Sequence, residues 1–340
     1  MKLPNKHPQL PQKKTGVLLI NLGTPDSTKW WDIRKYLKEF LSDRRVIEVN
    51  PVLWQLILNI FILTFRPAKT AKAYKKIWMK KQNMSPLRYF TIKQTTNVQK
   101  RLKNKFIEVD YAMRYGNPSI IKKLFELKEK GCQEMIVLPL YPQYAAATTA
   151  TVCDEVYRSL MKMRWQPSLQ VIPHYESEPL YIKALAESLK KALRESDWKP
   201  DVIVASYHGV PKKYFDKGDP YHCYCQKTTR LLVEHMKMEI PIVTTFQSRF
   251  GPDEWLKPYT DETIDNLPSE GKKKIFVICP GFASDCVETL EEISMEAKES
   301  FMENGGEKFL TVPCLNHNKE HIDLLEFLVK KYIIKRENWK

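Results

Sequence analysis

KIFVICPGFASDCVETLEEISME, residues 274–296, decides the fold class of this chain. Its first six residues are apolar and rich in β-branched side chains, which is typical of a buried strand. Pro280 and Gly281 end the strand, and after a short turn the pattern becomes helical. Open α/β sheets bind ligands beyond the carboxyl ends of their strands. Functional residues are therefore expected in this turn and in the helix that follows it.

The predicted helix has an acidic side and an apolar side. At about 100° per residue, four acids share one narrow sector. The sector contains Asp285, Glu288, Glu292 and Glu296, the opposite side contains Val287, Leu290 and Ile293, and Glu291 turns away from the acids. One interpretation is a solvated face, since the helix dipole favours acids in a first turn. The other is a path for a cation or for protons, and this stretch alone leaves both open.

The rest of the chain repeats the order strand, turn, helix. Turns of the second half match turns of the first in the same order: 209–211 matches 23–25, 249–252 matches 114–118, and 280–283 matches 140–143. This order predicts an α/β fold of two similar doubly wound parallel-sheet domains, Rossmann-like, with a cleft between them. The predicted parts are a flexible tail (1–14), a first domain (15–172) with an apolar lip (52–65), a second domain (173–312) and a C-terminal helix (313–340) that packs back across the domains.

His208 is the second candidate for function. It follows the strand VIVAS directly, in the turn SYHGVP, so its ring is expected at the carboxyl end of the sheet beside the acidic helix. A lone histidine is usually structural, but a histidine near carboxylates can bind a divalent metal or pass protons near neutral pH. The ligand spacing of a permanent zinc site is absent.

Composition narrows the partners. The 340 residues carry a net charge of +15, which attracts an anionic membrane, nucleic acid or an acidic small molecule. Seven scattered cysteines favour a reducing cytosol. The run 52–65 is apolar and is followed by a lysine-rich stretch. It is shorter than the roughly 20 residues of a spanning helix, so it is either a core helix or a lip at a bilayer surface. Nucleotide-binding glycine motifs are absent, which argues against a nucleotide enzyme.

Ten short motifs together identify a family. They are NLGTPD (21–26), FRPAK (65–69), IW (77–78), SPL (85–87), MRYGNP (113–118), LYPQY (140–144), SYHGVP (206–211), GDPYHCYCQKTT (218–229), FQSRFGP (246–252) and PGFASDCVETLEEI (280–293). In this order the chain resembles the ferrochelatases over nearly its whole length. The resemblance implies a lyase that inserts ferrous iron into protoporphyrin IX to give protoheme, the terminal step of heme biosynthesis.

The resemblance also assigns roles to residues. It implies that His208 and Glu288 are catalytic and meet the iron, and that Asp285 and Glu292 extend an acidic path. The implied porphyrin contacts are Arg66 and Ser85 at the propionates, Arg114 and Tyr115 on the pocket wall, and Tyr141 and Phe282 along the macrocycle. The expected enzyme has no permanent cofactor and no nucleic-acid partner. It is expected to be cytoplasmic, with peripheral contact to the inner face of an anionic membrane.

Three positions depart from the family pattern. Cys286 stands where many members have a second histidine, and Leu22 stands where relatives place methionine or tyrosine beside the macrocycle. The C-terminal tail lacks the cysteines that hold an iron–sulfur cluster in some members, so no cluster is expected. Two alternatives remain beside the main interpretation: a cobalt or nickel chelatase for another tetrapyrrole, and a non-catalytic basic α/β protein that binds membranes or nucleic acid.

Overall fold

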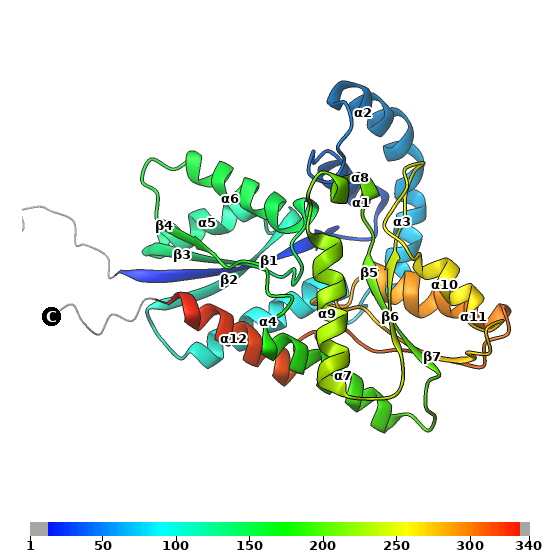
Figure 1. Ribbon diagram of the computed structural model, residues 1–340. Helices are drawn as coiled ribbons and strands as arrows, with labels where there is room; N and C mark the ends of the chain where they lie inside the picture. The colour runs from blue at the N-terminus through cyan, green and yellow to red at the C-terminus, as the bar shows by residue number, and fades with distance from the viewer. Residues whose placement is uncertain (1–12, 334–340) are drawn as a thin grey trace, which may run out of the picture.

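The computed structural model describes residues 13–333, and most of the predicted tail (1–14) lies outside that range. The described residues form two sheets of four parallel strands (Figure 1). The first sheet has the order β2-β1-β3-β4, with β1 Lys14–Thr24, β2 Ile107–Gly116, β3 Cys132–Pro139 and β4 Ser168–Val171. The second has the order β6-β5-β7-β8, with β5 Val202–His208, β6 Ile242–Gln247, β7 Lys274–Ile278 and β8 Lys308–Thr311. The predicted fold class, two similar parallel-sheet α/β units, is confirmed.

Helices on both faces explain why the strand sequences are apolar almost throughout. In β1 nearly every residue is buried, as expected for a central parallel strand covered on both sides. The first unit contains α1 Trp30–Leu41, α4 Pro86–Leu102, α5 Ile120–Glu129, the π-helix η2 Ala146–Ala150 and α6 Thr151–Met161. The second contains α8 Lys212–Asp216, α9 Tyr221–Met236, α10 Thr260–Asn266, the π-helix η3 Glu288–Ala297 and α11 Lys298–Glu303.

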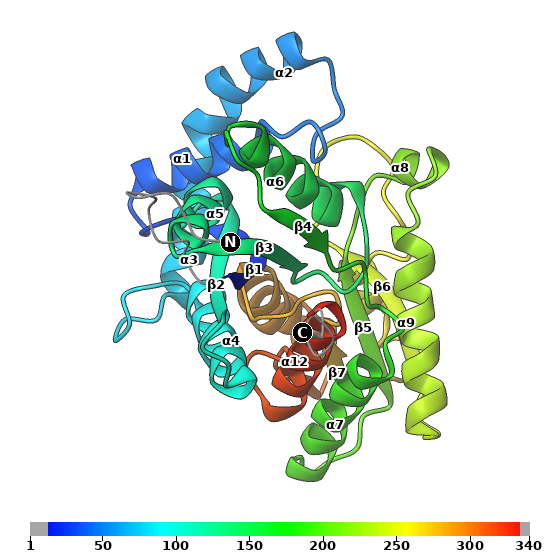
Figure 2. The same ribbon diagram turned by 90° about the vertical axis from the view of Figure 1, so that its left-hand side faces the viewer.

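Two further helices join the units, because each follows the sheet of one unit and packs against the other unit. Helix α7 (Pro179–Glu195) follows the last strand of the first sheet but packs against α9 of the second unit. Helix α12 (Lys319–Tyr332) follows the last strand of the second sheet but packs against α4 and β3 of the first. The two helices also pack on each other (Figure 2). As a result one hydrophobic core includes Leu19 and Ile203 from the two sheets and Leu189 and Leu325 from the exchanged helices.

The predicted lip is part of a longer exposed helix. Helix α2 (Pro51–Ile57), the π-helix η1 (Leu58–Ile62) and α3 (Leu63–Ile77) follow one another without a break, and α2 projects from the edge of the molecule (Figures 1 and 2). Asn50 caps this helix by accepting hydrogen bonds from Val52 N and Leu53 N. The prediction of a 14-residue segment was too short, because the helix continues into the lysine-rich sequence.

The lip is exposed, so the alternative of an ordinary core helix is wrong. Its exposed side chains are Val52, Leu53, Leu56, Ile60, Phe61 and Phe65, the last with 72% of its surface free. By length and composition the 27 residues Pro51–Ile77 are sufficient to cross a membrane, and 17% of the most apolar window is buried in the protein. An exposed apolar surface of this kind marks an interaction site.

Candidate active site

His208 is the last residue of β5, and its ring is half buried. The ring Nδ1 lies 2.8 Å from the carbonyl oxygen of Gly209. A carbonyl only accepts hydrogen bonds, so Nδ1 carries the proton and Nε2 keeps the lone pair of a base. A side chain at Gly209 would meet the backbone oxygen of Gln247 at 2.9 Å, so the chain needs glycine there. The strand end thus presents Nε2 in a fixed orientation.

A buried polar network fixes the structure beneath His208. Ser206 Oγ donates to Gln247 Oε1 at 2.7 Å and lies 2.8 Å from Thr260 Oγ1, which in turn donates to Thr245 Oγ1. The amide of Gln247 donates to the main-chain oxygen of Glu288 at 3.0 Å. The network therefore holds the first residue of η3 against the ends of β5 and β6.

The acidic helix is a π-helix, which corrects the predicted row of acids. A π-helix pairs residue i with i+5, so angles derived from 3.6 residues per turn do not apply. Glu291, predicted to turn away from the other acids, is only 9% exposed and forms an ion pair with Lys76 Nζ at 2.6 Å. The side chain of Glu296 is exposed as a whole. Partial burial of its carboxyl group and repulsion from Glu291 raise the pKa of that group. Glu291 and Glu296 are i and i+5 neighbours, while Glu288 and Glu292 remain on the side of His208.

Glu292 links the two predicted catalytic residues. Burial raises the pKa of its carboxyl, the negative charge of Glu288 raises it further, and Ser248 and His208 oppose the shift. Ser248 Oγ donates to Glu292 Oε2 at 2.5 Å. The carboxyl of Glu292 therefore lies close enough to His208 and to Glu288 to respond to the charge of each. Across residues 13–333, no three His, Cys, Asp or Glu side chains are close enough to hold a metal ion together.

Asp285 lies at the start of the helix but outside this group. Its carboxylate accepts hydrogen bonds from Asn316 Nδ2 at 2.6 Å and from Cys314 N and Thr289 Oγ1, both at 3.1 Å. All of these donors belong to η3 or to the loop before α12. The structure thus gives Asp285 a set of partners that the sequence analysis did not anticipate.

The first unit contributes tyrosines to the same region. Tyr141 is buried, and within the described part of the chain its hydroxyl has no hydrogen-bond partner. Burial raises the pKa of Tyr141, and the negative charge of Glu288 adds to that shift. Tyr36 of α1 and Tyr74 of α3 are affected in the same way: burial is the main reason for their raised pKa values, and Glu288 contributes to both. Sequence reasoning missed Tyr36 and Tyr74, because both lie in segments interpreted only as helices.

Arg114 and Tyr115 lie deeper than their predicted place on a pocket wall. The Arg114 guanidinium pairs with Asp43 and donates to Thr151 Oγ1 at 2.7 Å. Tyr115 has no exposed surface, and its hydroxyl donates to Asp43 at 2.9 Å. In this structure both side chains bind Asp43 and Thr151, so direct contact with a porphyrin stays a prediction.

The remaining predicted residues lie at three other places. The Arg66 guanidinium stacks 4.6 Å above the ring of Phe250 from the second unit, and burial lowers its pKa. Ser85 caps α4 by accepting from Arg88 N. The ring of Phe282 lies 6.5 Å from that of His208, so Phe282 faces the catalytic group.

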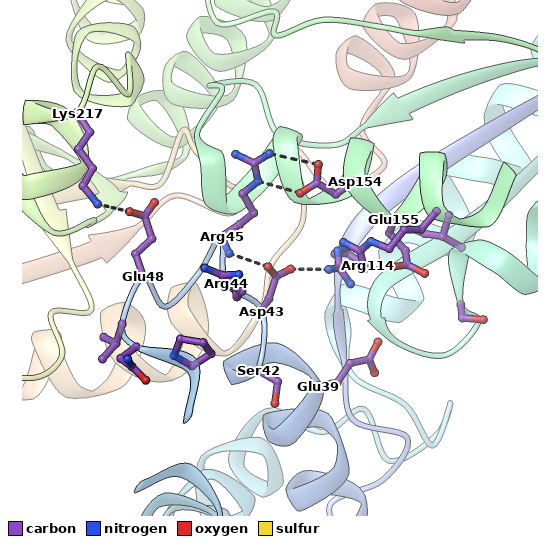
Figure 3. Close-up of a pocket in the computed structure, with 16 residues that line it drawn as sticks. Glu39, Ser42, Asp43, Arg44, Arg45, Glu48, Arg114, Asp154, Glu155 and Lys217 are labelled. Carbon is purple, nitrogen blue, oxygen red and sulfur yellow. Dashed lines mark hydrogen bonds and ion pairs between the residues drawn. The ribbon is translucent and has the colours of Figure 1, made fainter. Parts of the chain in front are cut away.

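A cavity of about 1000 Å³ is lined mainly by charged and polar residues (Figure 3). Its wall includes the loop between α1 and α2, residues of α6, Arg114 and Lys217. Ion pairs cross it, Arg45 with Asp154 at 2.8 Å and Lys217 with Glu48 at 2.5 Å. Of the predicted site residues, Arg114 lines this cavity, whereas His208 and Glu288 do not.

The two parallel sheets with their flanking helices form a chelatase-type fold. SirB from Bacillus subtilis, solved with Fe³⁺, superposes with a TM-score of 0.58 at 11% identity, covering 94% of this chain and 95% of that chain. CbiX, the terminal enzyme of siroheme biosynthesis in denitrifying bacteria, superposes with a TM-score of 0.51 at 11% identity. The superposition covers 94% of this chain and 100% of that chain. At this identity the likeness shows the fold alone.

Sequence relatives identify the family within that class. The Ferrochelatase family model matches residues 14–333. Ferrochelatase from Agrobacterium fabrum is 52% identical over 97% of this chain and 96% of its own length, and ferrochelatase from Francisella tularensis is 48% identical over 94% and 96%. The chain belongs to the ferrochelatase family. It is an enzyme that inserts iron into protoporphyrin, which confirms the resemblance and excludes the non-catalytic alternative.

Proposed function

We propose that His208, Glu288 and Glu292 act as one group that removes the two pyrrole protons of protoporphyrin as ferrous iron enters the ring. The proposal depends on Glu292. The charges of both His208 and Glu288 shift the pKa of its carboxyl, so Glu292 lies near both residues. A carboxylate with a raised pKa is a stronger base than an ordinary glutamate and suits proton transfer near neutral pH.

The chemistry requires two acceptors. Protoporphyrin loses two N–H protons, and the ring dianion then holds Fe²⁺, so two protons and one iron ion exchange places. His208 Nε2 is free to accept one proton, because Nδ1 is committed to Gly209 O. The pair Glu288 and Glu292 accepts the second and passes it along η3 toward solvent. Either carboxylate can also meet the iron briefly, with His208, before the ring nitrogens bind it.

Both units supply the binding surface. The rings of Tyr141 from the first unit and Phe282 from the second fit an apolar macrocycle, which needs aromatic walls. Arg66, which stacks on Phe250, and Ser85, which caps α4, remain the proposed partners of the propionates. Arg114 and Tyr115 support this wall through Asp43 and contact the porphyrin only if that pairing opens.

The pH dependence of turnover tests the role of Glu292. It must be ionised to accept a proton, and its pKa lies above the ordinary 4.5. Activity should therefore fall on the acid side at a higher pH than an ordinary glutamate would cause. Glu292→Gln should lower kcat and change this acid limb, whereas the exposed control Glu299→Gln should change neither. An unchanged kcat and acid limb in Glu292→Gln would exclude the proposed group.

We further propose that the exposed helix 51–77 docks the enzyme on the cytoplasmic face of an anionic membrane. Six apolar side chains are exposed on this helix, and lysines follow them on α3. Apolar burial together with basic residues next to it is the combination that binds such surfaces. Docking would let an apolar porphyrin arrive, and heme leave, through lipid.

Flotation with liposomes tests the docking. Wild-type protein should float with anionic vesicles at low salt and less at high salt. Replacing Phe61 and Phe65 by serine should reduce flotation strongly. The matched control replaces Tyr157 and Met161 on α6, which are exposed to a similar degree, and should float like wild type. Wild-type protein that remains in the soluble fraction at low salt would contradict the docking.

A further inference from the structure

The loop before α12 contacts the start of the catalytic helix through Asn316. Asn316 Nδ2 donates to Asp285 Oδ2 at 2.6 Å, and Asp285 N donates back to Asn316 Oδ1 at 2.9 Å. This reciprocal pair is closed further by Cys314 N and Thr289 Oγ1, which both donate to Asp285 Oδ1. The two carboxylate oxygens thus share three donors, and Asp285 is only 7% exposed.

Asn316 is itself held from two sides. Its main-chain oxygen accepts from Gln94 of α4 at 2.7 Å and from His321 Nδ1 of α12 at 2.7 Å. The same Gln94 amide donates to Ala283 O and to Ser284 Oγ, in the turn that leads into η3. The backbone of Asn316 is left-handed, with φ of 47°, a conformation that asparagine and aspartate tolerate better than other side chains. The loop is therefore rigid where it meets Asp285.

We propose that Asn316 and Asp285 are positioning residues, which fix the first turn of η3 so that Glu288 faces His208. The proposal rests on the role given above to Glu288. Asp285 then acts through its hydrogen bonds and not as a carrier of protons or iron. Thr289 transmits the constraint, because its hydroxyl donates to Asp285 and accepts from Cys286 N at 3.1 Å. In the sequence, Glu288 lies between Cys286 and Thr289, so the constraint acts on both sides of it.

The geometry gives a test that separates a hydrogen-bond role from a charge role. Asp285→Asn would place two amide donors against each other, and Asn316→Asp would place two carboxylates together. The exchanged pair, Asp285→Asn with Asn316→Asp, restores all four hydrogen bonds and moves the negative charge to position 316. Both exchanged residues suit their backbone, since aspartate also tolerates a left-handed φ.

We expect each single variant to lower kcat by roughly 10- to 100-fold, the scale of a misplaced catalytic group. The exchanged pair should recover most of that loss. The KM for porphyrin should stay near wild type throughout, because the porphyrin wall is untouched. Circular dichroism and thermal melts confirm folding, and the exchanged pair is the variant expected to fold most like wild type.

The matched control is Asn318→Ala, in the same loop. Asn318 caps α12 by accepting from His321 N and has no contact with Asp285. This variant should lose stability but keep kcat. If the exchanged pair is as inactive as Asp285→Asn, or if Asn316→Ala keeps full turnover, the positioning role is wrong and the charge of Asp285 is needed in place. If the proposed roles of His208 and Glu292 are wrong, the variants Glu292→Gln and His208→Ala will keep full activity. That result is distinct from a failure of the positioning role.

Discussion

The two α/β units share one backbone plan but differ in chemistry at the ends of their central strands. Strand β1 ends in Asn21-Leu22-Gly23-Thr24-Pro25 and β5 ends in Tyr207-His208-Gly209-Val210-Pro211. In this alignment Leu22 occupies the place of His208. The first unit therefore offers an apolar side chain where the second offers a base.

The π-helices show the same difference. Each unit has a π-helix after its third strand in sequence: η2 Ala146–Ala150 in the first and η3 Glu288–Ala297 in the second. The sequence of η2 is AATTA, whereas η3 begins with a glutamate and contains four in ten residues. The first unit thus has small uncharged side chains at this place, and the second has the carboxylates proposed above to handle protons and metal. A flat macrocycle between them would be held from one side and deprotonated from the other.

The loops that lead into α7 and α12 also differ between the two units. Residues 172–178 lead from β4 to α7 and residues 312–318 lead from β8 to α12, with a proline second in each. The place of Asn316 is taken in the first unit by Glu176, which binds His174 and Lys227 and not the π-helix. The two units thus share a fold but differ in the residues at matching places, and the residues proposed as catalytic lie in the second unit.

The largest expected effect is at His208. His208→Ala should lower iron insertion by about 10²- to 10⁴-fold, the usual worth of general acid–base help. Leu22→Ala, at the matching place in the first unit, should keep turnover within about tenfold, because no proton passes there. An anaerobic assay of iron insertion measures both. Comparable losses in the two variants would show that the units contribute equally and would remove the asymmetry.

Glu288→Gln should have the next largest effect. The isosteric amide cannot accept a proton, and we expect kcat to fall by about 10²-fold, near the lower end for general base catalysis, because Glu292 lies beside it. Unfolding by denaturant should show little change, since the side chain is half exposed. A loss of stability with normal turnover would instead make Glu288 a structural residue of η3.

His321 of α12 should make the free energy of unfolding depend on pH, whereas the residue at the matching place in α7 should not. Burial lowers the pKa of His321 to about 4, from an ordinary 6.5. The unfolded chain then binds a proton at this residue between those values and the folded chain does not, so stability is full above about pH 6.5 and falls as the pH drops toward 4. The full loss is about 3 kcal/mol. Its counterpart, the third residue of α7, is Tyr181, which keeps its proton in this range.

Denaturant unfolding at pH 7.5 and pH 5 checks this effect. His321→Gln should be less stable at neutral pH but should lose less on acidification than wild type. Tyr181→Phe removes a hydroxyl without changing any charge below pH 7 and serves as the control for a perturbed core. Identical acid losses in wild type and His321→Gln would show that other groups account for the pH dependence.

The sequence allowed the fold class and the position of His208 at a strand end to be predicted for physical reasons. Buried parallel strands are apolar throughout, and His208 and Glu288 follow two of them closely. The arrangement of the acids was not predictable, because a helical wheel assumes 3.6 residues per turn and η3 is a π-helix. The pairing of Arg114 with Asp43 was also hidden, since 71 residues separate them and both stand in ordinary-looking segments.

The smallest expected effect, at Glu291, tests that corrected arrangement. The helical wheel turned Glu291 away from the other acids and predicted almost no loss of turnover for Glu291→Gln. The structure instead pairs it with Lys76 of α3, an ion pair that joins the exposed helix of the first unit to the catalytic helix of the second. Lys76 is half exposed, so the pair is screened by solvent and the loss should be modest.

Glu291→Gln should therefore lower the denaturation midpoint slightly and leave kcat unchanged, the reverse of Glu288→Gln. Lys76→Met should produce a similar small shift, and the double variant should add little to either single one, because the two residues form one interaction. A fall in kcat without a change in stability would place Glu291 among the catalytic acids. It would also mean that proton transfer uses both sides of η3, and the functional difference between the two units would then extend to the surface that faces α3.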